Sequence, residues 1–348
     1  MFSGIIIVAM SIKSVLSGFS RTRFFSLACL VVVAAAIVHR MSATGTVDSF
    51  ELASWNMRWF PSGYMKPQEA DRELERINRA ARLVREQGRI PDVFFAQEIR
   101  DMKTCVAFAS RLNDPAFKPI VCSSFTETAD RTNSIVGLQQ VAIFSRFKAL
   151  ESGAEPWHTK DFVTPPRGYA YAVLEVGTNL VAVFNVHLKS NFIPKISGGK
   201  AEQEAFDKQQ FVLNRLKREL SCRQLLDAVA EIRKNDYGGR RVSAVVLGGD
   251  FNHSVYDDRF AGEDSTRAIL SAGFINVFAG RSGEEWATLP PSQWYPYAIF
   301  DYVFADGLSA AEGTQRVLKE HRRYGMSDHR QIRARLSFPG PAGNPALP

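Results

Sequence analysis

A carboxylate and a carboxamide stand two positions apart at the end of an apolar run, in the segment VVLGGDFNH at 245–253. The apolar residues predict a buried strand, and the two glycines predict a tight turn that presents Asp250 and Asn252. Ligand-binding and catalytic groups of open α/β sheets collect beyond the carboxyl ends of strands, which makes this pair a candidate for chemistry. The alternative is that the two side chains only form a polar turn, as Asp and Asn often do.

The same pattern, a polar side chain that ends an apolar run, recurs along the chain, while Asp301 stands at the start of its predicted strand. An unpaired buried carboxylate is costly, so several of them together imply a cation or histidine partners. Oxygen ligands without cysteine favour Mg²⁺, Mn²⁺ or Ca²⁺ over zinc. The residues at predicted strand exits are Asn56, Glu98, His187, Asp250, Asn252, Asp328 and His329.

The elements that must position these residues alternate between strands and helices at first, and several strands later follow one another directly. This order indicates a mixed α/β sandwich more than a pure doubly wound sheet. Amphipathic spacing predicts helices at 69–87 and about 202–234. Apolar runs predict strands at 49–55, 92–96, 141–144, 169–176, 180–186, 242–247, 300–305 and 332–336. No domain boundary can be placed inside 49–338.

The composition is that of an ordinary globular protein, with 348 residues of which 45% are hydrophobic and 23% charged. Its formal net charge of +7 is unevenly distributed. Residues 1–43 hold four basic residues and no acidic one, which leaves 39 basic against 36 acidic residues downstream. The net charge therefore says little about nucleic acid, and any affinity for anions must be local.

The first 43 residues are expected to act as a targeting segment. Arg21 and Arg23 precede an apolar run from Phe24 to Val38, which is shorter than the roughly 20 residues of a membrane span. We expect a signal peptide or a retained N-terminal membrane anchor, and hence export to the periplasm or outside the cell. At the other end, Pro, Gly and Ala dominate 339–348, and this tail is expected to be disordered.

Cysteine usage leaves two possibilities open. Cys29 lies in the apolar run, so Cys105, Cys122 and Cys222 remain, and at most one disulfide can form within a monomer. Export would permit a Cys105–Cys122 disulfide, and the alternative is three unpaired thiols.

Six short segments, in this order, resemble the endonuclease/exonuclease/phosphatase superfamily, which includes DNase I, apurinic endonucleases, inositol polyphosphate phosphatases and bacterial sphingomyelinases. The resemblance covers about 49–338, and the order of the segments makes it more specific than any one of them. The segments are Trp55-Asn56, Gln97-Glu98, Asn185-Val-His187-Leu-Lys189, Gly249-Asp250-Phe-Asn252, Asp301-Tyr302-Val303 and Ser327-Asp328-His329.

The resemblance implies a DNase I-like α/β/β/α sandwich of two packed mixed sheets, with the site at the top between the sheets. Glu98 would hold the metal ion, Mg²⁺ or else Mn²⁺ or Ca²⁺, with Asn56 and Asp328 nearby. Asp250 and Asn252 would position and activate the attacking water. His329, oriented by Asp301, and His187 would face the scissile phosphate. Phosphodiester hydrolysis needs these parts: a base, a metal ion and donors for the leaving oxygen.

His187 makes the chain resemble the DNase I and sphingomyelinase branches more than the apurinic-type branch, which generally lacks a histidine there. DNase I-like members pair that histidine with a glutamate, and here Gln139 or Gln140 falls nearby. A neutral amide would raise the pKa of His187 less than a carboxylate would, so the charge of His187 at neutral pH is open.

Further polar residues follow the strand exits. They could contact phosphate, although isolated charges are more often ordinary surface residues. His253 could touch substrate, but a solvated turn histidine is the simpler interpretation. The candidate phosphate contacts are Arg58, Arg100, Lys189 and Asn191.

Three functions follow from this pattern. The first is an exported metal-dependent phosphodiesterase, a monomer that acts on nucleic acid. The second is the same chemistry on a lipid or inositol phosphate at a membrane, although no apolar hairpin for bilayer insertion is evident. The third is a non-catalytic interaction module on the same fold, which is disfavoured because every expected metal and acid/base position is filled.

Overall fold

The computed structural model describes residues 47–128, 134–291, 297–319 and 325–339. The predicted export segment 1–43 lies outside these ranges, as does the predicted tail apart from Pro339. Within the described part of the chain, no helix has both the length and the apolar character needed to cross a bilayer.

The first of two large sheets has seven strands in the order β13-β15-β1-β2-β6-β3, with β14 paired to β15. Its centre is β1, which pairs parallel to β2 and antiparallel to β15. The strands are β1 (Ser49–Phe60), β2 (Val93–Ile99), β3 (Lys118–Cys122), β6 (Gln140–Ser145), β13 (Ser309–Ala310), β14 (Arg316–Leu318) and β15 (Gln331–Ser337).

The second sheet has six strands in the order β11-β12-β10-β9-β8-β7. Its central pair, β9 and β10, is parallel, and the pairs on either side are antiparallel. The strands are β7 (Lys148–Pro156), β8 (Gly168–Val176), β9 (Asn179–His187), β10 (Ala244–Asp250), β11 (Ile275–Asn276) and β12 (Asp301–Asp306). A separate small hairpin joins β4 (Thr126–Thr128) to β5 (Ser134–Val136).

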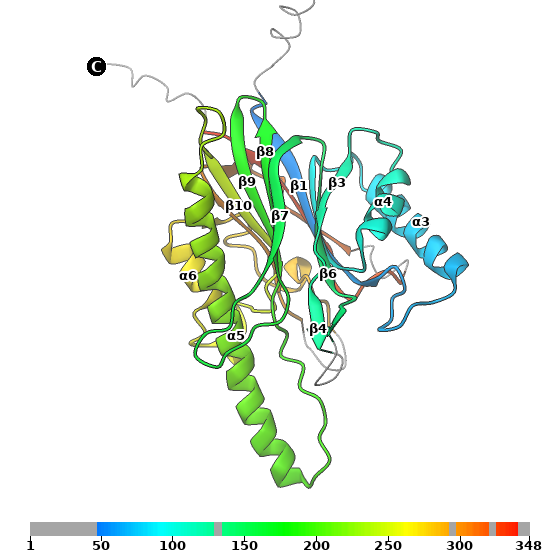
Figure 1. Ribbon diagram of the computed structural model, residues 1–348, viewed down its shortest axis with the longest axis vertical. Helices are drawn as coiled ribbons and strands as arrows, with labels where there is room; N and C mark the ends of the chain where they lie inside the picture. The colour runs from blue at the N-terminus through cyan, green and yellow to red at the C-terminus, as the bar shows by residue number, and fades with distance from the viewer. Residues whose placement is uncertain (1–46, 129–133, 292–296, 320–324, 340–348) are drawn as a thin grey trace, which may run out of the picture. The chain divides into compact units, whose positions relative to one another are not determined.

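Helices cover the outer face of each sheet, as Figure 1 shows. On the first sheet, α3 (Ala70–Glu86) buries Ile77, Ala81 and Val84, and α4 (Met102–Ser110) begins at an Asp101 side chain that accepts from Thr104 N at 2.7 Å. Such a cap satisfies one of the free N–H groups of the first turn. The second sheet is covered by α5 (Lys200–Lys234) and α6 (Ser265–Ser271), and two 3₁₀ turns complete the set, η2 (Asp258–Phe260) and η3 (Glu284–Trp286).

Most buried residues of the long helix α5 lie in its C-terminal half. Cys222, Leu225 and Val229 there pack on the second sheet, while no residue of the first two turns is buried. Figure 1 shows the N-terminal half extending beyond the sheets, together with the loop that leaves β9. This extension stands on the side where the carboxyl ends of β9 and β10 lie.

The main core lies between the two sheets, where the inward faces interdigitate. Phe95 and Ile143 of the first sheet share one apolar cluster with Val183, Val246 and Val303 of the second, and all are fully buried. Face-to-face packing of this kind leaves no room for water between the sheets, so it holds the ends of their strands in a fixed relation.

The predicted fold class, a four-layer sandwich of two mixed sheets, is confirmed. The expected strands and helices are present with small shifts of their ends, and the largest shift is in β1, which continues to Phe60 instead of ending at Trp55. Asn56 therefore lies within the strand, where an irregularity in the pairing with β2 begins and continues to Phe60. Short or half-exposed elements such as α4, β3 and β7 have no counterpart in the sequence prediction, because they lack a long apolar pattern.

Candidate active site

Three of the predicted residues lie side by side on adjacent strands of the second sheet. Asp250 ends β10, and the register pairs it with His187 on β9 and with Asp301 on β12. The turn into Asp250 requires Gly249, whose φ is +130° and where a Cβ would stand only 2.0 Å from Val186 O. Only glycine tolerates both conditions.

The first sheet contributes Asn56 from β1 and Glu98 from β2. Glu98 has a φ of +57°, at an irregularity in the pairing of β2 with β6, so that its side chain leaves the regular alternation of the strand. The amide nitrogen of Asn56 donates to Glu98 Oε1 at 3.2 Å and to Asp250 Oδ2 at 3.0 Å. Asn56 therefore joins the carboxylates of the two sheets across the mouth of the sandwich.

His329 follows the last loop and lies against Asp301. Its Nδ1 is 2.8 Å from Asp301 Oδ2, and its Nε2 is 3.8 Å from Asp250 Oδ2. Asp301 thus fixes the ring so that Nδ1 carries a proton and Nε2 faces Asp250, as an orienting carboxylate does. The loop is held by Ser327, whose hydroxyl donates to Asn56 O at 2.6 Å, and by Trp55 Nε1, which donates to His329 O at 3.1 Å.

Burial sets the protonation of Asp250 and His329. Burial first, and then the nearby charge of Asp301, raise the pKa of Asp250 to about 7, against the opposing effects of His329 and of the N–H donors of Asn56 and Asn252. Burial alone would lower the pKa of His329, but Asp301 and Asp250 raise it well above its ordinary value. The arrangement therefore holds a cationic imidazole next to a carboxylate that can take up a proton near neutral pH.

His187 is buried and neutral. Burial, reinforced by the positive charges of Arg167, His329 and Lys189, holds its pKa well below the ordinary value. Its Nε2 lies 3.7 Å from Glu98 and 3.6 Å from Asp250, and its Nδ1 has no hydrogen-bond partner among the described residues.

The expected pairing of His187 with Gln139 or Gln140 is wrong. The side-chain amide of Gln140 is hydrogen-bonded to Ser123 and to the backbone of Phe125 and Gly137. Gln139 accepts from Arg167, which in turn donates to the carbonyl oxygens of His187 and Leu188. Arg167 thus holds the backbone at the exit of β9. Among the described residues, neither glutamine forms a hydrogen bond with the imidazole of His187.

Asn252 and the loop after β9 are tied together. Asn252 adopts a φ of +49°, which asparagine tolerates better than most residues, and its Nδ2 donates to Leu188 O at 3.2 Å. Its backbone N–H donates to Asp250 Oδ1 at 2.9 Å. The predicted pair, Asp250 and Asn252, therefore forms one rigid turn beside His187. Its buried hydrogen bonds distinguish it from a solvated polar turn.

Lys189 and Asn191 lie on the same loop. Burial, and the charge of Arg167, lower the pKa of Lys189 to about 8, and its ammonium donates to Ser190 O at 2.7 Å. Asn191 Oδ1 accepts from Arg218 at 2.8 Å. Arg218 is fully buried in a two-pronged ion pair with Glu263, at 2.7 and 2.6 Å, and anchors this loop to α5.

The remaining predicted contacts are more dispersed. Asp328 is exposed, and among the described residues no hydrogen bond or ion pair joins its carboxylate to Glu98. Arg100 is engaged with Glu73 at 2.8 Å and with Asp101 at 3.4 Å. Arg58 is exposed at the mouth, and its backbone N–H donates to Asn56 Oδ1 at 3.0 Å.

Two buried amides that had no predicted role join the sheets directly behind the site. Gln97 Nε2 donates to Asn185 Oδ1 at 2.7 Å and to Ser54 Oγ at 3.1 Å. Asn185 Nδ2 donates to the carbonyl oxygens of Ala96 and Ala142, both at 2.9 Å. Both belong to segments that carry the family resemblance, Gln97 directly before Glu98 and Asn185 two residues before His187, although the resemblance implied no role for either.

The donor set fits a divalent cation. Glu98 and Asp250 converge on the Asn56 amide, and among the described residues their only ion-pair partners are histidines, with no Lys or Arg. Asp250, Asp301 and His329 form a second, buried group whose ligand atoms all lie within 4.8 Å. The cationic His329 compensates the charge of Asp301, so we regard that group as a proton-sharing unit. The histidine beside Glu98 is the neutral His187, which makes the Glu98 side the better place for an ion.

His253 is not the solvated turn residue that the sequence suggested. It is buried, with Nδ1 3.0 Å from Thr266 Oγ1 and its ring against Phe260. Burial, and the charges of Arg218 and Arg267, lower its pKa to about 4 although Glu263 opposes them. Asn252 lies in the site, whereas the next residue, His253, packs beneath η2.

Acid should therefore destabilise the fold through His253. Because the pKa of His253 is lower in the folded state, protonation favours the unfolded chain. The free energy of unfolding is therefore highest above the unfolded pKa of about 6.5 and decreases by up to about 3 kcal/mol as the pH falls towards 4. Urea denaturation of wild type and His253→Gln between pH 7 and 4 measures this. The variant, which keeps an acceptor for Thr266, should lose less free energy of unfolding over that range, and parallel curves for the two proteins would contradict the assignment.

The cysteines Cys105, Cys122 and Cys222 are all free thiols, so of the two possibilities the disulfide is not formed. Burial, together with the neighbouring Cys122, raises the pKa of the Cys105 thiol well above its ordinary value. A thiol of this kind stays protonated, and it is the thiolate that forms disulfides.

No family model and no curated protein matches the sequence. Solved structures share its fold over most of its length. An endonuclease/exonuclease/phosphatase protein from Beutenbergia cavernae is 15% identical, with 84% of this chain and 72% of that one covered and a TM-score of 0.57. A family protein of the same description from Bacteroides thetaiotaomicron is 18% identical, covering 84% and 98%, with a TM-score of 0.53. Truncated Caenorhabditis elegans TDP2 is 17% identical, covering 83% and 98%, with a TM-score of 0.51. At these identities the likeness is one of architecture, and this chain has the DNase I-like fold of the endonuclease/exonuclease/phosphatase superfamily.

Proposed function

We propose that this protein is an exported, divalent-metal-dependent phosphodiesterase that hydrolyses nucleic acid. The observation that carries the proposal is the convergence of Asp250 with His187, with the Asp301–His329 pair and, through Asn56, with Glu98. Buried carboxylates are costly unless they are used or compensated, and this group has the composition that phosphoryl transfer requires. Export rests on the apolar run of 24–38.

Asp250 is the proposed general base. With a pKa near 7 it can accept the proton of the attacking water as the new phosphorus–oxygen bond forms. The Asn252 amide, fixed by Leu188 O, lies on the same turn and would orient that water. Neither group needs to move, since the turn that carries both is buried and hydrogen-bonded.

His329 is the proposed cationic partner. Asp301 keeps it charged, and no hydrogen bond within the described residues engages its Nε2. It can therefore donate to the phosphate and then to the departing oxygen as the second phosphorus–oxygen bond breaks. His187, held neutral, would donate a hydrogen bond to a nonbridging oxygen without transferring its proton.

Glu98 would hold the metal ion, with Asn56 beside it. When bound, it would offset the negative charge that builds on the nonbridging oxygens of the phosphate. Two further residues would steer the substrate, Arg58 at the exposed rim and Lys189 on the loop after β9.

Removal of divalent cations should abolish the activity. Purified protein should nick plasmid DNA in Mg²⁺, lose at least about 10³-fold in rate with EDTA, and recover when Mg²⁺ is restored. The same assay is run on RNA, sphingomyelin and inositol phosphates, with Asp250→Asn as the inactive control. Equal rates with and without EDTA, or no hydrolysis of any of these substrates in Mg²⁺, Mn²⁺ or Ca²⁺, would refute the proposal.

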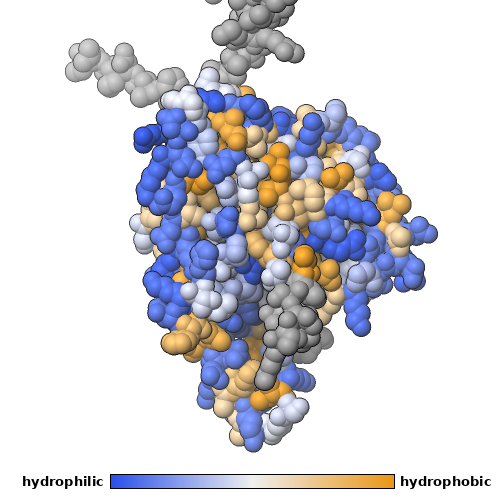
Figure 2. Space-filling model, viewed as in Figure 1, coloured by the Kyte–Doolittle hydropathy of each residue, from blue (hydrophilic) through white to orange (hydrophobic). Residues whose placement is uncertain are grey.

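A lipid phosphodiester is the second candidate, favoured by large apolar side chains that are exposed on loops. Phe162 is fully exposed, and Phe192, Met65 and Tyr64 are each about two-thirds exposed. Apolar side chains also lie among polar ones on the extension formed by the start of α5 and the loop before it (Figure 2). Such residues can enter the headgroup region of a membrane. Phosphocholine release from sphingomyelin vesicles that exceeds the rate on DNA would decide for this candidate.

A further inference from the structure

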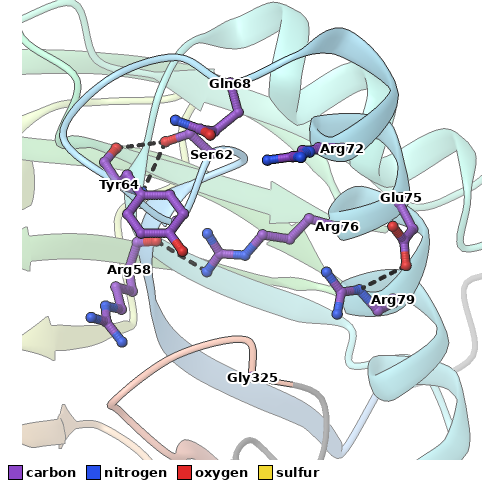
Figure 3. Close-up of a pocket in the computed structure, with 10 residues that line it drawn as sticks. Arg58, Ser62, Tyr64, Gln68, Arg72, Glu75, Arg76, Arg79 and Gly325 are labelled. Carbon is purple, nitrogen blue, oxygen red and sulfur yellow. Dashed lines mark hydrogen bonds and ion pairs between the residues drawn. The ribbon is translucent and has the colours of Figure 1, made fainter.

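A basic cavity of about 360 Å³ lies beside the proposed active site, between the loop after β1 and the face of α3 that carries Arg72, Arg76 and Arg79. Figure 3 shows its walls, with arginines of α3 facing Tyr64 and Arg58 across the opening. Among the described residues, four arginines line it against one carboxylate, that of Glu75. The charged and aromatic residues of this arginine pocket are Arg58, Tyr64, Arg72, Glu75, Arg76 and Arg79.

The positive charge of the arginine pocket is only partly compensated among the described residues, by Glu75 and, at Arg76, by the carboxylate of Asp328. Glu75 pairs with Arg79 at 3.7 Å, and both side chains are partly exposed. Arg58 and Arg72 are exposed, and neither forms a salt bridge with any described residue. The charges of Arg58 and Arg79 disfavour the cationic form of Arg76, so an anion that enters the pocket stabilises the arrangement.

Arg76 provides a second, independent observation. Only 6% of it is exposed, and its Nη2 donates to the carbonyl oxygens of Met57 and Arg58, both at 3.1 Å, and to that of Met326. Its Nε and Nη1 have no hydrogen-bond partner among the described residues. Buried donors are rarely left unpaired, because each costs about 1–3 kcal/mol.

The loop after β1 is shaped around this guanidinium. A Cβ on Gly63 would stand 2.1 Å from Arg76 Nη1, and the φ of Gly63 is +80°. The glycine therefore lets the loop lie directly on the arginine. Tyr64, the next residue, lies over the guanidinium in Figure 3. It is 66% exposed, so its ring can move away without disturbing the core.

The arginine pocket adjoins the proposed active site through the backbone. Arg58 is two residues from Asn56, a separation of at most about 7 Å along an extended chain. The Met326 carbonyl that Arg76 contacts precedes Ser327, which is hydrogen-bonded to Asn56. An anion in the pocket would therefore lie within reach of a phosphate held at Asp250 and His329.

We propose that the arginine pocket binds a second phosphate group of the substrate, beside the one that is hydrolysed. This rests on the proposed phosphodiesterase function and narrows it to substrates with at least two phosphates. On nucleic acid, the second group would be a neighbouring phosphate of the same strand. Arginine suits the task because its planar fork can hold two oxygens of one phosphate at once. A purely structural role for Arg76 accounts for its Nη2 contacts but leaves the other two nitrogens and the unpaired Arg58 and Arg72 unexplained.

The first test is direct binding of inorganic pyrophosphate to the full chain in EDTA, measured by calorimetry. Arg72→Gln should weaken binding by about tenfold or more, the loss expected for one charge-assisted contact. Arg82→Gln is the matched control, since Arg82 is an exposed arginine of α3 outside the pocket lining and should bind as wild type does. Equal affinities for Arg72→Gln and Arg82→Gln would overturn the proposal. Because Arg72 is exposed, its variant should fold even where Arg76→Gln does not.

The second test compares two substrates in Mg²⁺, a dinucleotide with a single phosphodiester and the same dinucleotide with a 5′-phosphate. Wild type should show the higher kcat/KM on the second, and Arg72→Gln should lose about tenfold of that preference. An unchanged preference would overturn the proposal. Inositol bisphosphate is also tested as an inhibitor. If Arg72→Gln weakens this inhibition as much as it weakens pyrophosphate binding, the second phosphate bound in the pocket is that of a lipid headgroup. Weakened pyrophosphate binding in a chain that hydrolyses nothing would support the pocket and overturn only the proposed function.

Discussion

Asp250→Asn is expected to lower kcat/KM for phosphodiester hydrolysis by about 10³- to 10⁴-fold, the range typical of losing a general base. The substitution keeps the shape of a side chain that is almost wholly buried, and it removes only the oxygen that can take up the proton of the attacking water. The measurement is kcat/KM on plasmid or oligonucleotide DNA in saturating Mg²⁺, with the pH held at 7.5.

Stability separates this chemical effect from misfolding. Both oxygens of Asp250 accept hydrogen bonds, from Asn56 Nδ2 and from the Asn252 N–H, so the amide loses one of them and Tm should fall by only a few degrees while the fold is kept. Asp306→Asn is the matched control, because Asp306 lies at the other end of β12 in a surface ion pair with Arg233 and should retain activity. Less than a tenfold loss of kcat/KM in Asp250→Asn would remove Asp250 from the role of base.

Arg218→Met is expected to lower the free energy of unfolding by about 3–5 kcal/mol, the usual cost of leaving one member of a buried ion pair behind. Glu263 would then be buried without its cation, and only Ser265 would still donate to it, at 2.8 Å. The loop after β9 would also lose its anchor, since Arg218 donates to Lys189 O at 2.9 Å. Urea denaturation at pH 7 measures the loss.

Arg215→Met is the control for Arg218→Met. Arg215 stands nearly one turn earlier on α5, pairs with Glu219 at 2.9 Å and is partly exposed, so its loss should cost less than about 1 kcal/mol. The double variant Arg218→Met/Glu263→Leu should recover much of the stability, because two apolar groups replace both charges. If Arg218→Met costs no more than Arg215→Met, the pair does not hold the loop.

Periodicity and strand-end residues account for most of what the sequence predicts correctly. The 3.6-residue spacing of Ile77, Ala81 and Val84 predicts α3, because such a face has to be buried. The apolar runs of β9 and β10 predict central strands, and their last residues, His187 and Asp250, are paired in register. Parallel neighbours end at the same edge of a sheet, so a pattern along the chain becomes a cluster in space.

The sequence is a poor guide wherever a contact joins the two sheets or closes a loop. The segments that contain Asn185 and Gln97 are recognisable, but nothing in them predicts that the two side chains meet, because their hydrogen bond forms only where the sheets face each other. His253 has the sequence context of a turn residue although Thr266 of the next helix covers it. The expected Gln139–His187 pairing is absent because Arg167 stands between the two residues.

The amino-acid sequence by itself determined the class of fold and the chemistry available at the strand ends, since burial patterns and residue types act locally along the chain. Only the tertiary structure decided which side of α3 meets the loop after β1, and so gathered the arginines of the pocket. It also decided that Asp250 is flanked by two histidines of different charge. The physical reason is that pKa and electrostatic potential depend on distance and burial, which separate segments acquire only when the sheets pack.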